Sequence, residues 1–136
     1  MKVSTRTRYA LRAILIIAKS TRGIETSEVI AREEGISKKY LDSILGALRK
    51  SGLLRSERGI LGGYSLADTP EKTTVLQICE VLEKASVLSP CVDDDGYCPK
   101  SCICPGNSVW KQATEAMKKV LREATIATLL EEEKNC

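Results

Sequence analysis

The chain of 136 residues contains no histidine and no phenylalanine. Without histidine, any metal or redox chemistry must depend on its cysteines. Because aromatic residues make up only 4% of the sequence, the core must consist mainly of leucine, isoleucine, valine and alanine. No apolar run approaches the roughly 20 residues of a transmembrane helix, since the best candidate, residues 10–18, is interrupted by Arg12. The first residues also lack a signal-peptide cleavage site, so we expect a cytoplasmic protein with no membrane partner.

Charge is distributed unevenly along the chain. Residues 1–68 hold 13 lysines and arginines against 7 acidic residues, whereas residues 69–136 hold 8 against 11. A basic half favours contact with a polyanion such as nucleic acid, and the mildly acidic half indicates a second role. The length is that of one domain, or of one domain with an appendage.

Apolar residues recur mostly at helical spacing, which predicts a mainly α-helical protein. Serine and threonine residues stand where helix caps are needed, and glycine follows several of the apolar stripes. Helices are predicted over residues 5–20, 26–31, 37–50, 73–82, 108–122 and 126–130, and short strands over 53–58 and 64–67.

Two short helical segments separated by residues 35–37 have the anatomy of a helix–turn–helix. Gly35 permits the tight turn, and Ile36 fills the angle between the two helices. The second helix would present its N-terminal residues to the major groove of double-stranded DNA. These candidate contacts are Ser37, Lys38, Lys39, Asp42 and Ser43.

The hairpin predicted after this unit is a candidate wing. Arg58 precedes its glycine-rich tip, so the guanidinium group can enter a minor groove with little steric hindrance. A helical protein–protein module with a basic surface would show the same helices, but the wing favours DNA binding.

Four of the six cysteines lie within fourteen residues, at Cys91, Cys98, Cys102 and Cys104. Thiols stay reduced in the cytoplasm, so this group indicates metal binding or redox sensing rather than structural disulfides. Iron–sulfur clusters are held by thiolates from loops, whereas zinc sites prefer paired Cys-x-x-Cys knuckles, which are missing here. The spacing therefore favours iron–sulfur over zinc, and a disulfide switch is a third option.

The two other cysteines carry less information. Cys79 lies on the apolar face of a predicted helix and is expected to pack in the core. Cys136 stands at the end of a charged tail and is expected to be incidental.

The order of helix–turn–helix, wing, spaced cysteines and long C-terminal helix resembles the IscR type of iron–sulfur regulators. This family of bacterial winged-helix repressors includes the nitric-oxide-sensing NsrR proteins. The resemblance extends from Met1 to about Leu130. Its most specific motifs are residues 7–13 (TRYALRA), 35–41 (GISKKYL), 48–54 (LRKSGLL) and 58–64 (RGILGGY).

The resemblance implies a homodimer in which long C-terminal helices cross between subunits and each winged helix binds half of a pseudo-palindromic operator. It implies three cluster ligands, Cys91, Cys98 and Cys104, with a 2Fe–2S cluster expected first and a 4Fe–4S cluster as the alternative. It also assigns Ser37, Lys39 and Tyr40 to groove contacts, alongside Arg58 in the wing.

The fourth cluster ligand departs from the family pattern. IscR has a histidine three residues after the last cysteine, where this chain has Asn107. Some relatives use a carboxylate near the N-terminus of the partner subunit, where this chain has Arg8. Cys102 has no counterpart among the usual three ligands, and either it or Asn107 is a possible fourth. Asp42 and Ser43 replace the acidic residue and glutamine of IscR, so the operator preference can differ.

These features together predict a transcriptional repressor that senses iron–sulfur cluster status and controls cluster assembly genes. A nitric-oxide or thiol-redox sensor of the same architecture is the alternative. An electron-transfer protein or oxidoreductase fits less well, because the chain has no nucleotide-binding loop, and we expect no enzyme activity. The predicted regions are a DNA-binding region (1–68), a connecting helix (69–85), a cluster loop (86–107), dimerisation and terminal helices (108–130) and a tail (131–136).

Overall fold

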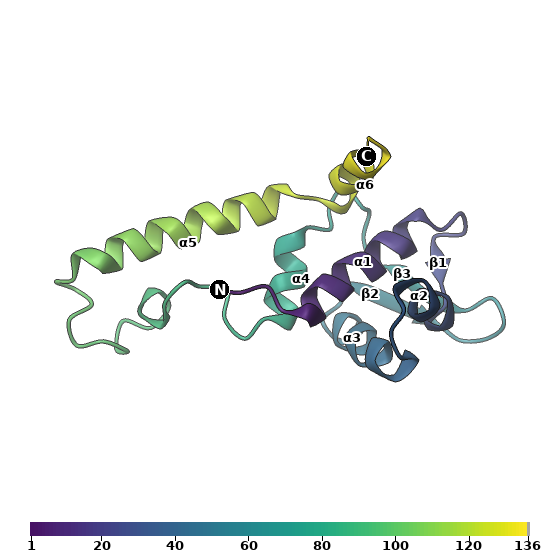
Figure 1. Ribbon diagram of the computed structural model, residues 1–136, viewed down its shortest axis with the longest axis horizontal. Coiled ribbons are helices and arrows are strands. Elements are labelled where there is room, and N and C mark those ends of the chain that lie inside the picture. Colours follow the sequence, from purple (N-terminus) through teal and green to yellow (C-terminus); the bar gives the residue numbers. More distant parts are fainter. Residues whose placement is uncertain (136) are drawn as a thin grey trace.

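The computed structural model describes residues 1–135, so Cys136 lies outside the described residues. The chain is mainly helical with one small sheet, as the sequence predicts (Figure 1). Its elements are α1 (Thr5–Lys19), β1 (Ile24–Glu25), α2 (Ser27–Glu34), α3 (Lys38–Lys50), β2 (Leu54–Glu57), β3 (Gly63–Leu66), α4 (Val75–Leu82), the 3-10 helix η1 (Pro90–Val92), α5 (Pro105–Glu123) and α6 (Ile126–Lys134).

Helix α1 forms the centre of the core because one of its faces is apolar along its whole length. Its side chains at helical spacing pack against α3, and Ile78 of α4 and Ile126 of α6 join the same cluster. Helices from both halves of the sequence therefore pack into one core around α1. The fully buried side chains of α1 and α3 are Ala10, Ala13, Ile14, Ile17, Leu41, Ile44, Leu45 and Leu48.

The sheet is antiparallel with the strand order β1-β3-β2. The two strands of the hairpin were expected, but β1 was not, because two residues are too few to show an alternating pattern. Gly63 shows why the close pairing of β1 and β3 needs glycine. Its φ of +145° suits glycine, and a Cβ atom there would collide with the carbonyl group of Glu25.

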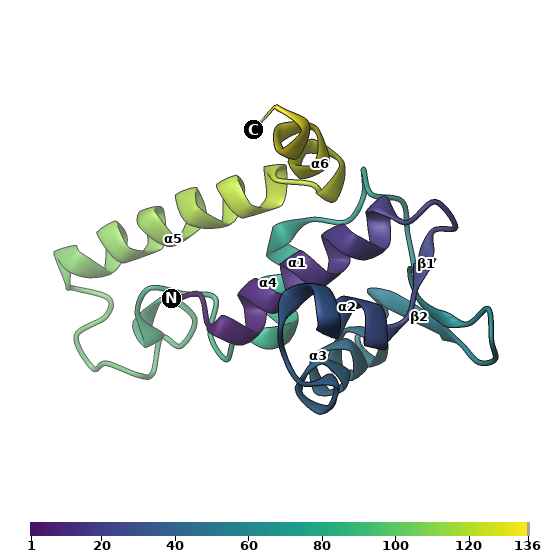
Figure 2. The ribbon, with the colours of Figure 1, turned by 45° about the vertical axis from the view of Figure 1, so that its right-hand side comes forward.

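Helix α5 runs from the cysteine loop back to the body of the molecule (Figures 1 and 2). Its C-terminal end is held by two backbone hydrogen bonds of 2.9 Å, from the Val75 amide to the Ala124 carbonyl and from the Ile126 amide to the Thr73 carbonyl. The helix is about 28 Å long at 1.5 Å per residue, so its other end reaches far from these bonds.

Both C-terminal helices are longer than the sequence predicts. Helix α5 begins three residues early, at Pro105, because proline suits the first position of a helix, where its missing N–H costs no hydrogen bond. Helix α6 continues through residues 131–134, which were expected to fray. Thr125 caps it and Leu130 packs against the core, so the helix is stabilised at its start and in its middle.

A single carboxylate joins the end of α4 to the start of α1. Oε1 of Glu83 accepts hydrogen bonds from the Ser4 amide (2.8 Å), the Ser4 hydroxyl (2.9 Å) and the Thr7 hydroxyl (2.5 Å). Partial burial acts to raise the pKa of Glu83, but the hydrogen bonds from Thr7 and Ser4 outweigh it, and the pKa lies below its usual range. The unfolded chain therefore binds this proton more tightly than the folded chain does.

Replacement of the carboxylate in Glu83→Gln should lower the free energy of unfolding near neutral pH by about 1–3 kcal/mol. The wild type should lose this stabilisation as the pH falls from the ordinary carboxyl pKa through the lowered folded-state pKa, and the variant should not. Urea denaturation at a series of pH values measures both effects.

The matched control is Glu80→Gln, an exposed position of the same helix. It should change the free energy of unfolding by less than about 0.5 kcal/mol. Equal acid sensitivity of the wild type and Glu83→Gln would contradict this role of Glu83.

Candidate functional site

The turn between α2 and α3 has the geometry of a helix–turn–helix. Gly35 ends α2 with a left-handed φ of +67°, and Ile36 packs against the core. Ser37 caps α3 by accepting a hydrogen bond of 3.1 Å from the Tyr40 amide. The predicted contacts therefore share the N-terminal half of one helix, and all except half-buried Asp42 are exposed: Ser37, Lys38, Lys39, Tyr40, Asp42 and Ser43.

A chain of side-chain contacts fixes α3 against α1 and α2. The Tyr40 ring meets the Tyr9 ring edge to face, with the ring centroids 6.1 Å apart. The Arg12 guanidinium lies over Tyr9, 5.5 Å from its centroid, and pairs with Glu34 at 2.5 Å. Tyr40 thus helps to position the helix, a role that no sequence pattern indicates because the four residues come from three elements.

Charge on the predicted recognition surface is partly balanced within the protein. Nζ of Lys38 lies 2.9 Å from a carboxylate oxygen of Asp42 and 3.9 Å from one of Glu28. The hydrogen bond and charge of Asp42 raise the pKa of Lys38, so this lysine is cationic. Asp42 therefore balances part of the charge of Lys38 within the protein.

The predicted wing is a hairpin of β2 and β3 that projects beyond the sheet (Figure 1). Arg58 is exposed where the loop leaves β2. Arg22, from the segment between α1 and β1, donates a hydrogen bond to the Leu61 carbonyl in this loop. The sequence did not single out Arg22, because it reaches the wing only through the pairing of β1 with β3.

The structure keeps the four clustered cysteines in one loop but does not assemble them. Cys91 lies in η1 and is half-buried, as is Cys98, whereas Cys102 and Cys104 are exposed. Within residues 1–135, no three histidine, cysteine, aspartate or glutamate side chains lie in a group able to hold a metal ion. All five cysteines of this range are free thiols.

Asn107 joins the two ends of the cysteine loop. Its side chain is buried, and its Nδ2 donates a hydrogen bond of 3.0 Å to the Cys91 carbonyl. A pocket of about 460 Å³ lies beside it, and both Cys102 and Cys104 line this pocket. Of the two possible fourth ligands, Asn107 is thus engaged in holding the loop, and Cys102 is an exposed thiol.

Donor chemistry in this loop fits an iron–sulfur cluster, which is held by cysteine thiolates. Cys104 stands at the N-cap of α5 without a side-chain capping bond, so the positive end of the helix dipole favours a negative ligand there. The sulfur of Cys91 lies 3.2 Å from the Ser89 hydroxyl. Closure of residues 91–104 around a metal centre requires the loop to rearrange.

Cys79 differs from these four residues. It is 1% exposed in α4, as expected for a core residue. Burial, and after it the nearby charges of Glu83 and Glu80, raises the pKa of this thiol. Cys79 therefore stays protonated and is no candidate ligand.

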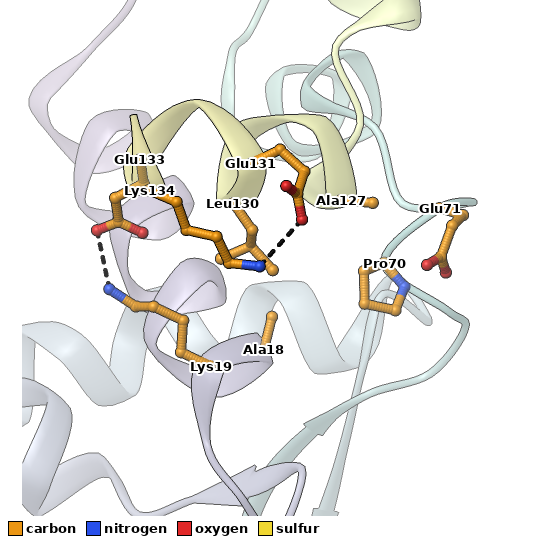
Figure 3. A pocket seen from close by; sticks show the side chains of 9 residues that line it. All are labelled: Ala18, Lys19, Pro70, Glu71, Ala127, Leu130, Glu131, Glu133 and Lys134. Atoms are coloured by element: carbon orange, nitrogen blue, oxygen red, sulfur yellow. Dashed lines mark hydrogen bonds and ion pairs between the residues drawn. The ribbon is translucent and has the colours of Figure 1, made fainter. Parts of the chain in front are cut away.

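A second pocket of about 510 Å³ lies where α6 crosses the end of α1 (Figure 3). Leu130 and Ala18 face each other there, and the charged groups pair among themselves, Lys19 with Glu133 at 2.9 Å and Lys134 with Glu131 at 3.0 Å. The Leu130–Ala18 contact and the Lys19–Glu133 ion pair attach α6 to the body, whereas the Lys134–Glu131 pair lies within α6.

Comparison with known proteins identifies relatives over the whole chain. The family model Rrf2, described as an iron-dependent transcriptional regulator, matches residues 3–132. The protein rrf2 of Nitratidesulfovibrio vulgaris is 34% identical over 138 residues, with 100% of this chain and 91% of the relative covered. Relatives named HTH-type transcriptional regulators include CymR of Bacillus subtilis and IscR of Serratia proteamaculans.

Two solved structures share this fold. CymR, the global cysteine regulator of B. subtilis, superposes with a TM-score of 0.79 and 29% identity, covering 97% of this chain and 98% of that chain. IscR of T. potens superposes with a TM-score of 0.77 and 32% identity, covering 98% of this chain and 88% of that chain. The predicted winged-helix fold is therefore confirmed, and the names of the relatives agree with a regulator rather than an enzyme.

No helix within residues 1–135 combines the length and apolar character needed to cross a lipid bilayer.

Removal of one negative charge in Asp42→Asn should release Lys38 toward DNA phosphates. The affinity for random-sequence duplex should rise severalfold, and the slope of log affinity against log salt should steepen by about 0.9 for one further phosphate contact. Fluorescence anisotropy over a salt series measures both quantities. Glu115→Gln makes the same charge change on exposed α5 and should leave the slope unchanged. Identical slopes for the two variants would exclude Asp42 from the interface.

Proposed function

Because the chain belongs to the Rrf2 family of iron-dependent transcriptional regulators, we propose that it is a dimeric DNA-binding repressor that responds to iron–sulfur cluster status. The genes it controls are those of cluster assembly. One observation carries the proposal: the cysteine loop, residues 86–104, lies between α4 of the winged-helix body and the projecting helix α5. A change in the conformation of the loop therefore acts on both α4 and α5.

Cys91, Cys98 and Cys104 are the proposed ligands, with Cys102 as the fourth. A bound cluster supplies a redox-active centre whose presence depends on iron and sulfide supply. The first residues of the loop are held by distant partners, since the Val87 carbonyl accepts a hydrogen bond of 3.1 Å from the N-terminal ammonium group and the Leu88 amide donates one of 3.3 Å to the Thr114 hydroxyl. From Cys91 to Cys104 the loop is held mainly by short-range turns, together with the Asn107 bond to Cys91 and an ion pair of 3.7 Å between Lys111 and Asp95. A segment with so few distant contacts is easily reordered by ligation.

The exposed face of α5 supports the dimer. Val109 is 54% exposed, Trp110 45% and Val120 66%. Ala113 and Met117 lie on the same side of the helix at helical spacing. Such a continuous apolar stripe on a projecting helix needs a partner, and a second copy of the same helix is complementary to it.

Repression depends on the spacing of the two recognition helices. A dimeric helix–turn–helix protein places them about 34–36 Å apart, one turn of DNA. In the proposed dimer, α5 sets this spacing, because its C-terminal end is bonded to the start of α4 and its N-terminal residue, Pro105, follows directly on Cys104. Thiolate ligation at residues 91–104 shifts the end of α5 and so changes the affinity for the operator.

Single replacements of the proposed ligands test the cluster. In Cys91→Ala, Cys98→Ala and Cys104→Ala, anaerobically purified protein should lose its visible absorbance and its iron and sulfide, while far-ultraviolet circular dichroism stays unchanged. The wild-type spectrum distinguishes a 2Fe–2S from a 4Fe–4S cluster. The control Cys79→Ala removes a buried thiol of α4 and should keep the cluster.

Cys102→Ala and Asn107→Ala identify the fourth ligand in the same assay. Loss of the cluster in Cys102→Ala alone assigns that thiol as the ligand. Stoichiometric iron in all three ligand variants would refute the proposed set.

The dimer has its own test. Trp110→Glu combined with Val120→Glu places charge in the apolar stripe of α5 and should give a monomer in sedimentation velocity at micromolar concentration. The affinity for the operator should also fall, because a monomer binds one half-site and loses the gain that a dimer has from binding two half-sites at once. Glu115→Lys, on the opposite side of α5, should leave the dimer intact; a monomeric wild type would refute the interface.

A second function has support from the exposure of Cys102 and Cys104, which line one pocket without a third ligand. In this reading the same architecture senses thiol oxidation or nitric oxide. Full operator binding by a metal-free, reduced protein would favour the thiol switch. Destruction of a bound cluster by a low dose of nitric oxide would favour the gas sensor.

A further inference from the structure

The tip of the wing carries two large apolar side chains in full contact with solvent. Ile60 is 100% exposed and Leu61 is 72% exposed. Isolated apolar residues are common on surfaces, but these two are adjacent in the loop that joins β2 to β3, and this loop projects beyond the sheet (Figures 1 and 2). They lie at the opposite end of the molecule from the cysteine loop.

The backbone of this tip forms a tight turn that is held by hydrogen bonds and requires glycine. The Gly62 amide donates a hydrogen bond of 3.0 Å to the Gly59 carbonyl, and Gly59 has a left-handed φ of +102°. A Cβ atom on Gly62 would collide with the carbonyl of Glu57, so the turn closes only with glycine there. Arg22 holds the Leu61 carbonyl from outside the hairpin. Ile60 and Leu61 are thus presented on a narrow, closed turn.

Charge around the tip matches a polyanion. Arg55 and Arg58 of the hairpin and Arg22 beside it are exposed, and Glu57 is the acidic residue among them. A protein partner is a poor match, because stable protein interfaces bury about 1,200–2,000 Å², far more than two side chains provide. A narrow apolar tip flanked by arginines instead matches a DNA duplex. Phosphates line both sides of each groove and can pair with the arginines while the apolar side chains face the groove.

We propose that Ile60 and Leu61 form an apolar wedge that enters the minor groove and partly unstacks one base-pair step. The inference rests on the proposed DNA-binding function and deepens it. Apolar side chains inserted from the minor groove unstack and kink DNA, and pyrimidine–purine steps deform most easily. The wedge therefore adds a preference for a flexible step in the flank of each half-site and bends the operator.

The test uses the full-length protein, both cluster-loaded and metal-free, with a duplex that the wild type enriches from a random-sequence pool. The duplex carries 2-aminopurine at successive flanking positions and a dye pair at its ends. The wild type should raise 2-aminopurine fluorescence at one step and shorten the distance between the dyes. Ile60→Ala should reduce both signals and lower affinity roughly tenfold, as loss of one buried apolar side chain would.

Three further variants separate the wedge from other roles. Ile60→Leu keeps an apolar side chain and should restore most of the bend. Arg58→Ala should reduce the slope of log affinity against log salt by about 1, whereas Ile60→Ala should leave the slope unchanged. Val3→Ala shortens another exposed apolar side chain, 45% exposed, and serves as the control. Because Ile60 is fully exposed, thermal melts of its variants should match the wild type.

The outcomes distinguish the wedge from the function on which it rests. Unchanged affinity and bend in the double variant Ile60→Ala/Leu61→Ala would overturn the wedge and leave DNA binding intact. Weaker self-association of that variant, with unchanged affinity of its dimer, would also overturn it and assign the tip to contact between copies. Enrichment of no sequence in either cluster state would contradict the proposed function, and the wedge with it.

Discussion

Two backbone hydrogen bonds, between Val75 and Ala124 and between Ile126 and Thr73, determine how the two halves of the chain act on each other. They fix the C-terminal end of α5 to the start of α4, and they direct Ile126 into the core beside α1. Helix α5 also packs against α4, and its buried Thr114 accepts a hydrogen bond of 3.3 Å from the Leu88 amide. Helix α5 is thus attached to the winged-helix body at its C-terminal end and to the cysteine loop at its N-terminal end. In the proposed function this is the route by which order in the loop would affect the recognition helices.

Periodicity explains what the sequence predicted and what it missed. The apolar stripes of α1, α3 and α4 repeat over enough turns to predict each helix, and the cap at Ser37 locates the candidate recognition surface. Strand β1 is too short for a pattern, and α5 starts early because proline at its first position extends it without an apolar signal. The contacts of Tyr9, Arg12 and Glu34 are tertiary, and a loop without a period does not reveal how far apart its four thiols lie.

Electrostatics alone would make this DNA-binding region a non-selective one, and two features limit that tendency. Asp42 holds the charge of Lys38 within the protein, so phosphate attraction at the recognition helix is weaker than the lysine count implies. At the wing, the wedge proposed for the exposed side chains of Ile60 and Leu61 would add a contact that salt does not screen. Both features would make binding depend less on attraction to phosphates, which every DNA sequence shares. It would depend more on base contacts and on how easily the duplex deforms, which differ between sequences.

Asn107 gives the cysteine loop a property that a metal-binding side chain would not. Its amide nitrogen already donates to the Cys91 carbonyl, so the start of the loop and the start of α5 are joined before any metal is bound. Ligation then has to order only the residues between them, and the entropic cost of closing the loop falls accordingly. An imidazole in this position would bind metal more strongly but would lose the preformed tie. In the proposed site Asn107 would therefore hold the ends of the loop together, and the fourth ligand would come from another residue.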